Sequence, residues 1–213
     1  MKDIIKNAKS YVKEIFENDF SGHDYFHTSR VYNNAMAIAQ KENANELIVG
    51  LAALLHDVDD VKLSPMTSEN KDRARKFLKD NNISEEIAEE VIDIINNISF
   101  SGSGKKVPGS IEGKIVQDAD RLDAIGAIGI ARTLTFGGNK NRVLYDPDIK
   151  PSTFENEAKY RSNNSTTINH FYEKLLLLKD LMNTKTAKEI ADKRHEFMEQ
   201  YLDQFFDEWN GLR

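Results

Sequence analysis

The dipeptide His56-Asp57 ends a continuous apolar run, Leu-Ile-Val-Gly-Leu-Ala-Ala-Leu-Leu, at residues 47–55. Apolar runs of this kind are buried, and an imidazole beside a carboxylate needs a partner there because an unpaired buried charge is costly. A divalent cation supplies that partner, since neutral His nitrogen and Asp oxygen are both ordinary metal ligands. The alternative is a pair at a helix end that bonds to backbone groups and does no chemistry.

A candidate for a third ligand lies upstream. His27 precedes Val31 and Ala35 at helical spacing, so we expect its side chain to face the core. His23 lies four residues before it, but Ser21-Gly22 places His23 at or before the start of the helix. We therefore expect His23 to lie near the substrate and not on the ion.

An acidic cluster downstream offers the remaining ligand. Asp118 and Asp120 are two residues apart, which on a helix separates their directions by about 200°, so only one of them can face a given ion. Asp120 and Asp123 differ by only about 60°, and Val116 falls on the same inward strip. We predict Asp120 as the ligand and Asp123 as its near neighbour, with Asp118 in place of Asp120 as the main alternative.

The bulk composition limits the classes of protein and of metal site. The chain has 213 residues, 39% of them hydrophobic and 30% charged, which is ordinary for one globular domain. Because there is no cysteine, disulfides and thiolate metal sites are excluded. The net charge of −6 argues against binding a long nucleic acid. No stretch approaches the roughly 18 apolar residues of a membrane span, and no signal peptide is recognisable, so we expect a cytoplasmic protein without membrane contact.

Helical periodicity recurs through most of the chain, and it predicts a single all-α domain over residues 1–213. Residues 46–56 are apolar nearly all round, which is typical of a central buried helix. A helix over residues 111–124 is expected to carry the acidic cluster, and the small residues 126–129 are expected to continue it. A long polar segment, residues 137–164, has little periodicity and is predicted to be a lid or a substrate-selecting loop.

Two helices are expected to close the chain. The first covers residues 166–182 and includes the run of four leucines at 175–178. The second is predicted to start near Thr186, with Glu189 completing a capping box, and to end near Trp209.

The order His27, His56-Asp57, Asp120 resembles the H…HD…D metal signature of the HD-domain metal-dependent phosphohydrolases. Longer segments also look like one bacterial branch of that superfamily, which includes enzymes similar to nucleoside-triphosphate pyrophosphohydrolases. These segments cover nearly the full length, at residues 22–31, 52–57, 117–132, 170–176 and 182–198. The resemblance implies an HD-type helical bundle that holds one divalent ion, whether Mn, Mg, Co, Ni or Fe.

The acids and bases near His56-Asp57 suggest further roles. In related HD phosphohydrolases an acidic residue four positions after the second histidine handles the attacking water, which makes Asp60 the candidate here. Asp60 would lie one turn beyond His56 if the helix continued. Asp59 is then expected to point away into solvent, and Lys62 to hold a phosphate group.

Other polar residues are candidates for binding a small anionic phosphate substrate, which the resemblance implies is a nucleotide. They are Arg30, Arg121, His170 and Lys174, together with His23 and Asp123. The expected reaction is hydrolysis of a nucleoside or deoxynucleoside triphosphate to the monophosphate and pyrophosphate. The alternatives are a phosphomonoesterase or phosphodiesterase acting on another small ester, and a catalytically silent binding module on the same scaffold.

Overall fold

A computed structural model describes residues 2–17, 24–60, 64–98, 107–152 and 165–212. These residues are helical or irregular and contain no strand, which confirms the predicted all-α class. The elements are α1 (Lys2–Ile15), α2 (Tyr25–Glu42), α3 (Glu46–Leu55), α4 (Asp72–Asp80), α5 (Glu85–Ile98), α6 (Ile111–Asp123), α7 (Gly126–Asn139), α9 (Asn169–Glu173), the 3₁₀ helix η1 (Leu175–Leu181) and α10 (Lys185–Trp209). No helix of the described part is long and apolar enough to cross a membrane.

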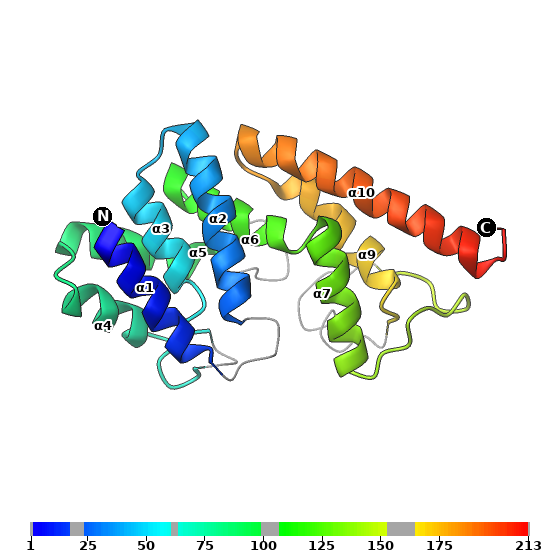
Figure 1. Ribbon diagram of the computed structural model, residues 1–213, viewed down its shortest axis with the longest axis horizontal. Helices are drawn as coiled ribbons and strands as arrows, with labels where there is room; N and C mark the ends of the chain where they lie inside the picture. The colour runs from blue at the N-terminus through cyan, green and yellow to red at the C-terminus, as the bar shows by residue number, and fades with distance from the viewer. Residues whose placement is uncertain (1, 18–23, 61–63, 99–106, 153–164, 213) are drawn as a thin grey trace. The chain divides into compact units, whose positions relative to one another are not determined.

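The described residues group into two compact units, one up to residue 120 and one from residue 121 onwards. The single domain over residues 1–213 remains a prediction. In the first unit α3 packs against α1, α2 and α5 (Figure 1). Every residue of α3 from Ile48 to Leu55 is buried, which confirms the expected central helix. Asn45 caps its start, where the side-chain oxygen accepts hydrogen bonds from the backbone N–H groups of Leu47 and Ile48.

The expectation that Asp59 points into solvent is wrong, because its side chain is fully buried. Its two carboxylate oxygens accept hydrogen bonds from the backbone N–H groups of Arg73, at 3.2 Å, and Ala74, at 2.9 Å. These donors belong to the first turn of α4, whose N-cap residue Lys71 supplies no side-chain cap. Asp59 therefore accepts from two backbone donors that have no partner within their own helix, which begins 13 residues later in the sequence.

Asp59→Ala should destabilise the first unit by roughly 1–3 kcal/mol, because two buried backbone donors would lose their acceptor. Urea unfolding followed by circular dichroism measures the change. Asp80→Ala is the matched control, since Asp80 lies at the exposed end of the same helix in an ion pair with Lys76. A loss no larger for Asp59→Ala than for Asp80→Ala would contradict the capping role.

The junction of α6 and α7 departs from the predicted continuous helix. α6 ends at Asp123, one residue before the expected end, and α7 begins at Gly126, whose φ is +74°. A left-handed φ favours glycine, so this residue breaks the helix and does not extend it. Gly129 is also required, since a Cβ there would lie 2.2 Å from the backbone oxygen of Ala124. The small residues permit a sharp turn between two helices.

The predicted helix over residues 166–182 is also wrong. The chain forms the short α9, leaves the α-helical region at Lys174 (φ −144°, ψ −57°), and continues as the 3₁₀ helix η1. Leu175 and Leu178 of the leucine run are buried, whereas Leu177 is 54% exposed. Burial at a spacing of three matches the period of a 3₁₀ helix.

The start of α10 lies slightly before the predicted position. Thr184, and not Thr186, is the N-cap residue, and its hydroxyl oxygen accepts a hydrogen bond from Ala187 N at 3.2 Å. Thr186 is buried inside the first turn, so the predicted capping box with Glu189 is wrong. The end of the helix at Trp209 confirms the predicted end.

Part of the long polar segment is tied to the second unit. α7 continues to Asn139, beyond the expected start of the loop. In the described part, Val143 and Leu144 accept backbone hydrogen bonds from Thr167 and Ile168, each at 3.0 Å. The ring of Tyr145 packs edge-on against rings of α10, namely Phe205, Phe206 and Trp209. Residues 153–164 lie outside the described residues, and the lid role stays a prediction.

Candidate metal centre

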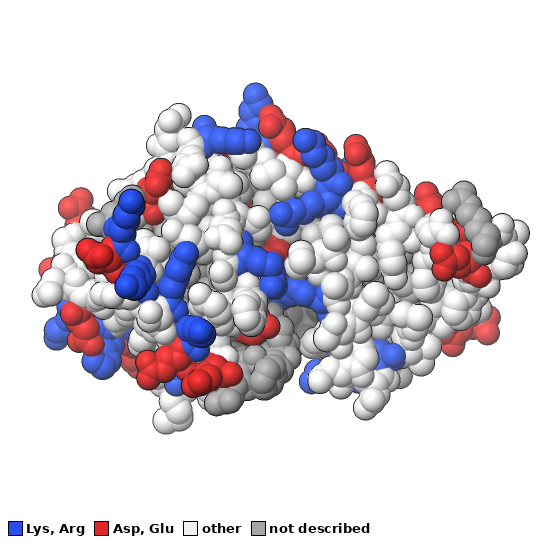
Figure 2. Space-filling model, in the orientation of Figure 1, with Lys and Arg blue, Asp and Glu red and all other residues white. Residues whose placement is uncertain are grey.

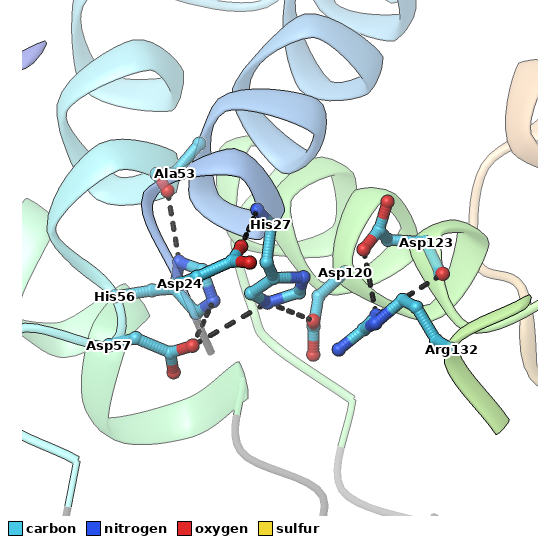
Figure 3. Close-up of polar contacts among 8 residues, drawn as sticks. All are labelled: Asp24, His27, Ala53, His56, Asp57, Asp120, Asp123 and Arg132. Carbon is cyan, nitrogen blue, oxygen red and sulfur yellow. Dashed lines mark hydrogen bonds and ion pairs between the residues drawn. The ribbon is translucent and has the colours of Figure 1, made fainter. Parts of the chain in front are cut away.

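Three buried side chains converge in the first unit from the first turn of α2 and the end of α3 (Figure 3). His27 and His56 each present an imidazole nitrogen and Asp57 a carboxylate oxygen, and these atoms all lie within 4.8 Å of one another. Asp57 Oδ2 lies 3.5 Å from His27 Nε2 and 3.2 Å from His56 Nε2. The three residues are only 2–9% exposed, so the cluster is closed on the core side.

Asp120 approaches the same cluster from α6, as predicted from its helical direction. Its Oδ1 lies 3.5 Å from His27 Nε2, and 35% of its side chain is exposed (Figure 3). Asp120 therefore lies on the more accessible side of the donors. Asp118 is fully buried, and the choice of Asp120 over Asp118 as a ligand stays a prediction.

The local structure at α2 explains how His27 is oriented. Asp24 is the N-cap residue of α2, and its carboxylate accepts a hydrogen bond from His27 N at 2.7 Å. This bond fixes the first helical turn, and with it the direction in which the His27 side chain leaves the backbone. This role of Asp24 was not predicted, although an Asp before an apolar helical stripe is a recognised start signal.

The hydrogen bond of His56 to the backbone determines which ring nitrogen carries the proton. His56 Nδ1 lies 2.9 Å from the carbonyl oxygen of Ala53, and because that oxygen can only accept, Nδ1 carries the proton. In the neutral ring Nε2 then has a lone pair, and it faces Asp57 Oδ2. Two electron-rich atoms at this distance favour a cation beside them. A backbone carbonyl that holds the second ring nitrogen in this way is the usual support of a metal-binding histidine.

The electrostatic field at His56 also favours positive charge. Burial lowers the pKa of His56, but the carboxylates of Asp57 and Asp120 and the bond to Ala53 raise it by more. The net result is a pKa raised from 6.5 to about 9. A field that holds a proton on a buried imidazole also attracts a divalent cation. The donor set of two imidazoles and two carboxylates therefore fits a divalent metal ion, and it suits several different metals.

Asp60 is placed by a turn and not by a continued helix. α3 ends at Leu55, and the following bonds run from Val58 N to Leu55 O and from Asp60 N to Asp57 O, at 3.3 and 3.0 Å. Bonds of this i to i−3 type bring residues three apart over one another. Asp60 is therefore aligned with Asp57 and not with His56, as a continued α-helix would require. Its side chain is half-buried, and its action on water stays a prediction.

Asp123 and Arg121 are engaged within the second unit. Asp123 is 1% exposed, and its Oδ2 accepts a hydrogen bond from Arg132 Nη1 at 2.7 Å (Figure 3). The Arg121 guanidinium donates to the carbonyl oxygen of Leu181. These contacts indicate structural roles for both residues, and their predicted roles in substrate binding remain untested predictions. The sequence analysis missed Arg132 as the partner of Asp123, although Arg132 ends the family-like segment 117–132.

The other predicted substrate residues are spread over the chain. Arg30 lies on α2 and is half-buried. Lys174 follows α9, one backbone turn after His170, since Lys174 N donates to His170 O at 3.0 Å. His23 and Lys62 lie outside the described residues, so their predicted roles near the substrate and on a phosphate group stay predictions.

The lowered pKa of His170 predicts that the free energy of unfolding falls in acid. Burial first, and then the positive charges of Lys174 and Arg142, lower its pKa from 6.5 to about 3. Between these values the unfolded chain binds a proton that the folded chain does not, so stability falls as pH drops below about 6.5, by up to about 1.4 kcal/mol per pH unit. The unfolding free energy of His170→Gln should fall less steeply than that of the wild type between pH 7 and 5. Parallel pH curves would contradict the assignment.

The chain is similar to proteins of a known family. A family model described as "HD domain" matches residues 24–125. YpgQ of Bacillus subtilis (strain 168) is 42% identical over 209 residues, which cover 97% of this chain and 94% of that protein. The crystal structure of an HD-superfamily hydrolase from Bacillus thuringiensis is similar with a TM-score of 0.80 and 44% identity over 98% of each chain. The structure of Bacillus subtilis YpgQ in complex with ADP gives a TM-score of 0.78 and 40% identity, covering 98% of this chain and 100% of that one.

Proposed function

The chain belongs to the HD-domain family of hydrolases, and from this premise we propose that it is a metal-dependent phosphohydrolase of nucleoside or deoxynucleoside triphosphates. The proposed products are the nucleoside monophosphate and pyrophosphate. The observation that carries the proposal is the convergence of His27, His56 and Asp57, with Asp120 beside them. This donor set contains no sulfur and suits the hard or borderline divalent ions that phosphate chemistry uses.

The four donors would hold one divalent ion. When bound, such an ion supplies Lewis acidity toward phosphate oxygens and lowers the pKa of nearby water. The protein contributes the orientation of its ligands. The Ala53 carbonyl holds His56 in the tautomer that presents Nε2, and Asp24 fixes the helical turn that carries His27.

Asp60 is proposed to orient the attacking water and to accept a proton from it. The water oxygen forms a bond to the α-phosphorus, and the bond from that phosphorus to the oxygen bridging to the β-phosphorus breaks. The electron pair leaves with pyrophosphate, and the proton passes to the Asp60 carboxylate and then to solvent. Asp60 suits this role because it follows the donors by one short turn and remains accessible.

A nucleotide is the proposed substrate class for two reasons. The related YpgQ protein of Bacillus subtilis was crystallised in complex with ADP, and it matches this chain over nearly its full length. The chain also offers positive side chains for a multiply charged phosphate group. Arg30 is the candidate in the first unit, and Lys62 is a further candidate outside the described residues.

The test is a panel of ribo- and deoxynucleoside triphosphates incubated with the purified protein and Mn²⁺, Mg²⁺, Co²⁺ or Ni²⁺, with the products separated and identified. We expect monophosphate and pyrophosphate in equal amounts and no turnover with excess chelator. Orthophosphate as the sole inorganic product would assign a phosphomonoesterase instead. Failure to hydrolyse any phosphate ester with any of the metals would assign a binding module.

A further inference from the structure

A basic groove lies along α1 in the first unit and includes none of the four candidate metal donors. It has a volume of about 290 Å³, and Figure 2 shows Lys and Arg side chains gathered over this helix. Its polar lining consists of Lys2, Lys6, Lys9, Lys13, Ser10 and Tyr25. No acidic residue is among the described residues that line the groove.

Acidic residues lie near the groove without pairing with its lysines: Asp3 and Glu14 belong to the same helix, and Glu46 acts on Tyr32, whose ring the Lys9 ammonium contacts. None of the four lysines takes part in an ion pair within the described part of the chain, in contrast to Lys76, which is paired with Asp80 in α4. Lys2 and Lys6, and likewise Lys9 and Lys13, stand four residues apart on one helix face. Like charges at this spacing destabilise a helix, and a bound anion would reverse that effect.

Local contacts prepare the groove for an anion. The Lys9 ammonium lies 4.1 Å from the centroid of the Tyr32 ring, a cation–π contact that restricts the long side chain. Lys2 and Lys6 lie in the first turns of α1, where the helix dipole adds positive potential. The hydroxyl groups of Ser10 and Tyr25 supply neutral hydrogen-bond donors beside the lysines.

We propose that this groove binds a short oligophosphate, either free or as the phosphate tail of a nucleotide. Four ammonium groups call for an anion with several charges, and phosphate groups carry the most charge in a small volume. A groove of 290 Å³ is at the lower end of small-molecule sites, which suits a chain of two or three phosphates. The site goes beyond the proposed function and does not rest on it, because it uses neither the metal donors nor Asp60.

Calorimetric titration of the metal-free protein, kept in excess chelator, with tripolyphosphate and with a nucleoside triphosphate tests this proposal. The chelator prevents binding through a metal ion, so the groove can be observed by itself. The variant Lys6→Gln/Lys13→Gln should weaken both ligands about 10-fold, because each exposed ion pair contributes up to about a fivefold factor. An equal loss for both ligands supports recognition of the phosphate chain.

Lys76→Gln/Lys79→Gln is the control, since it removes the same charge from α4 of the same unit and leaves the groove intact. Its affinity should stay within about twofold of the wild type. The thermal midpoint of Lys6→Gln/Lys13→Gln should be equal to or above that of the wild type, because like-charge repulsion is relieved. Undetectable binding to the wild type or equal weakening in both variants would overturn the proposal.

Discussion

His56→Ala should abolish binding of the divalent ion and reduce phosphohydrolase activity by roughly 10³-fold or more, since metal assistance contributes several kcal/mol of transition-state stabilisation. His56 is central to the donor set, because its Nε2 faces Asp57 and its Nδ1 is held by Ala53. Alanine removes a ligand and leaves the buried carboxylate without its neighbour. Metal content by mass spectrometry and activity with added Mn²⁺ are the two measurements.

A thermal-shift experiment separates loss of the metal site from loss of the fold. An ion that binds only the native state raises the melting temperature of the wild type, and this rise should vanish in His56→Ala. His195→Ala is the matched control, because His195 lies in α10 of the second unit and pairs with Glu199 at 3.2 Å. A metal content near that of the wild type in His56→Ala would refute the assigned ligand set.

The convergence of His27, His56 and Asp57, with Asp120 beside them, could be predicted because it depends on local patterns. The apolar run at 47–55 is buried as a helix, so the residues at its end had to lie at the edge of the core. The helical directions of His27 and Asp120 follow from the period of 3.6 residues. The two side chains point toward each other, and His27 Nε2 lies 3.5 Å from Asp120 Oδ1.

The capping role of Asp59 could not be predicted in this way, because it depends on contacts distant in the sequence. The residues that it caps begin α4, 14 and 15 residues further along the chain. Helical spacing predicts that Asp59 points away from His56, but it gives no information about contacts with α4. The break between α9 and η1 at Lys174 was likewise not predicted, because the leucine run fits helical spacing and contains no glycine or proline.

The contacts of Asp59 also bear on the proposed role of Asp60, since they fix the segment that follows the candidate metal donors. The Arg73 guanidinium donates to Ser64 Oγ at 2.7 Å and to the carbonyl oxygen of Val58 at 3.5 Å. The bonds from α4 to Asp59 fix the backbone immediately before Asp60, and Ser64 is held four residues after it. A fixed backbone next to Asp60 favours the orientation of a water by its side chain, as the proposed role of general base requires.

Asp60→Asn should lower kcat by roughly 10²–10⁴-fold, the usual range for a positioned acid–base group, while metal occupancy is largely kept. Asparagine keeps the shape and the hydrogen-bonding oxygen but cannot accept the proton of the attacking water. Because Asp60 is aligned with Asp57 over one short turn and is not one of the four donors, the metal-dependent rise in melting temperature should persist. Steady-state kinetics and metal analysis on the same preparation measure both quantities.

The pattern of effects distinguishes a base from a ligand. A ligand variant such as His56→Ala should lose metal and activity together, whereas Asp60→Asn should lose activity alone. Asp80→Asn, on the exposed end of α4, removes one carboxylate of the same unit and should change neither. If Asp60→Asn retained full activity, the proton acceptor would be another group. Asp123 would be the next acid to test, although its ion pair with Arg132 disfavours it, because the guanidinium stabilises the ionised carboxylate and so weakens it as a base.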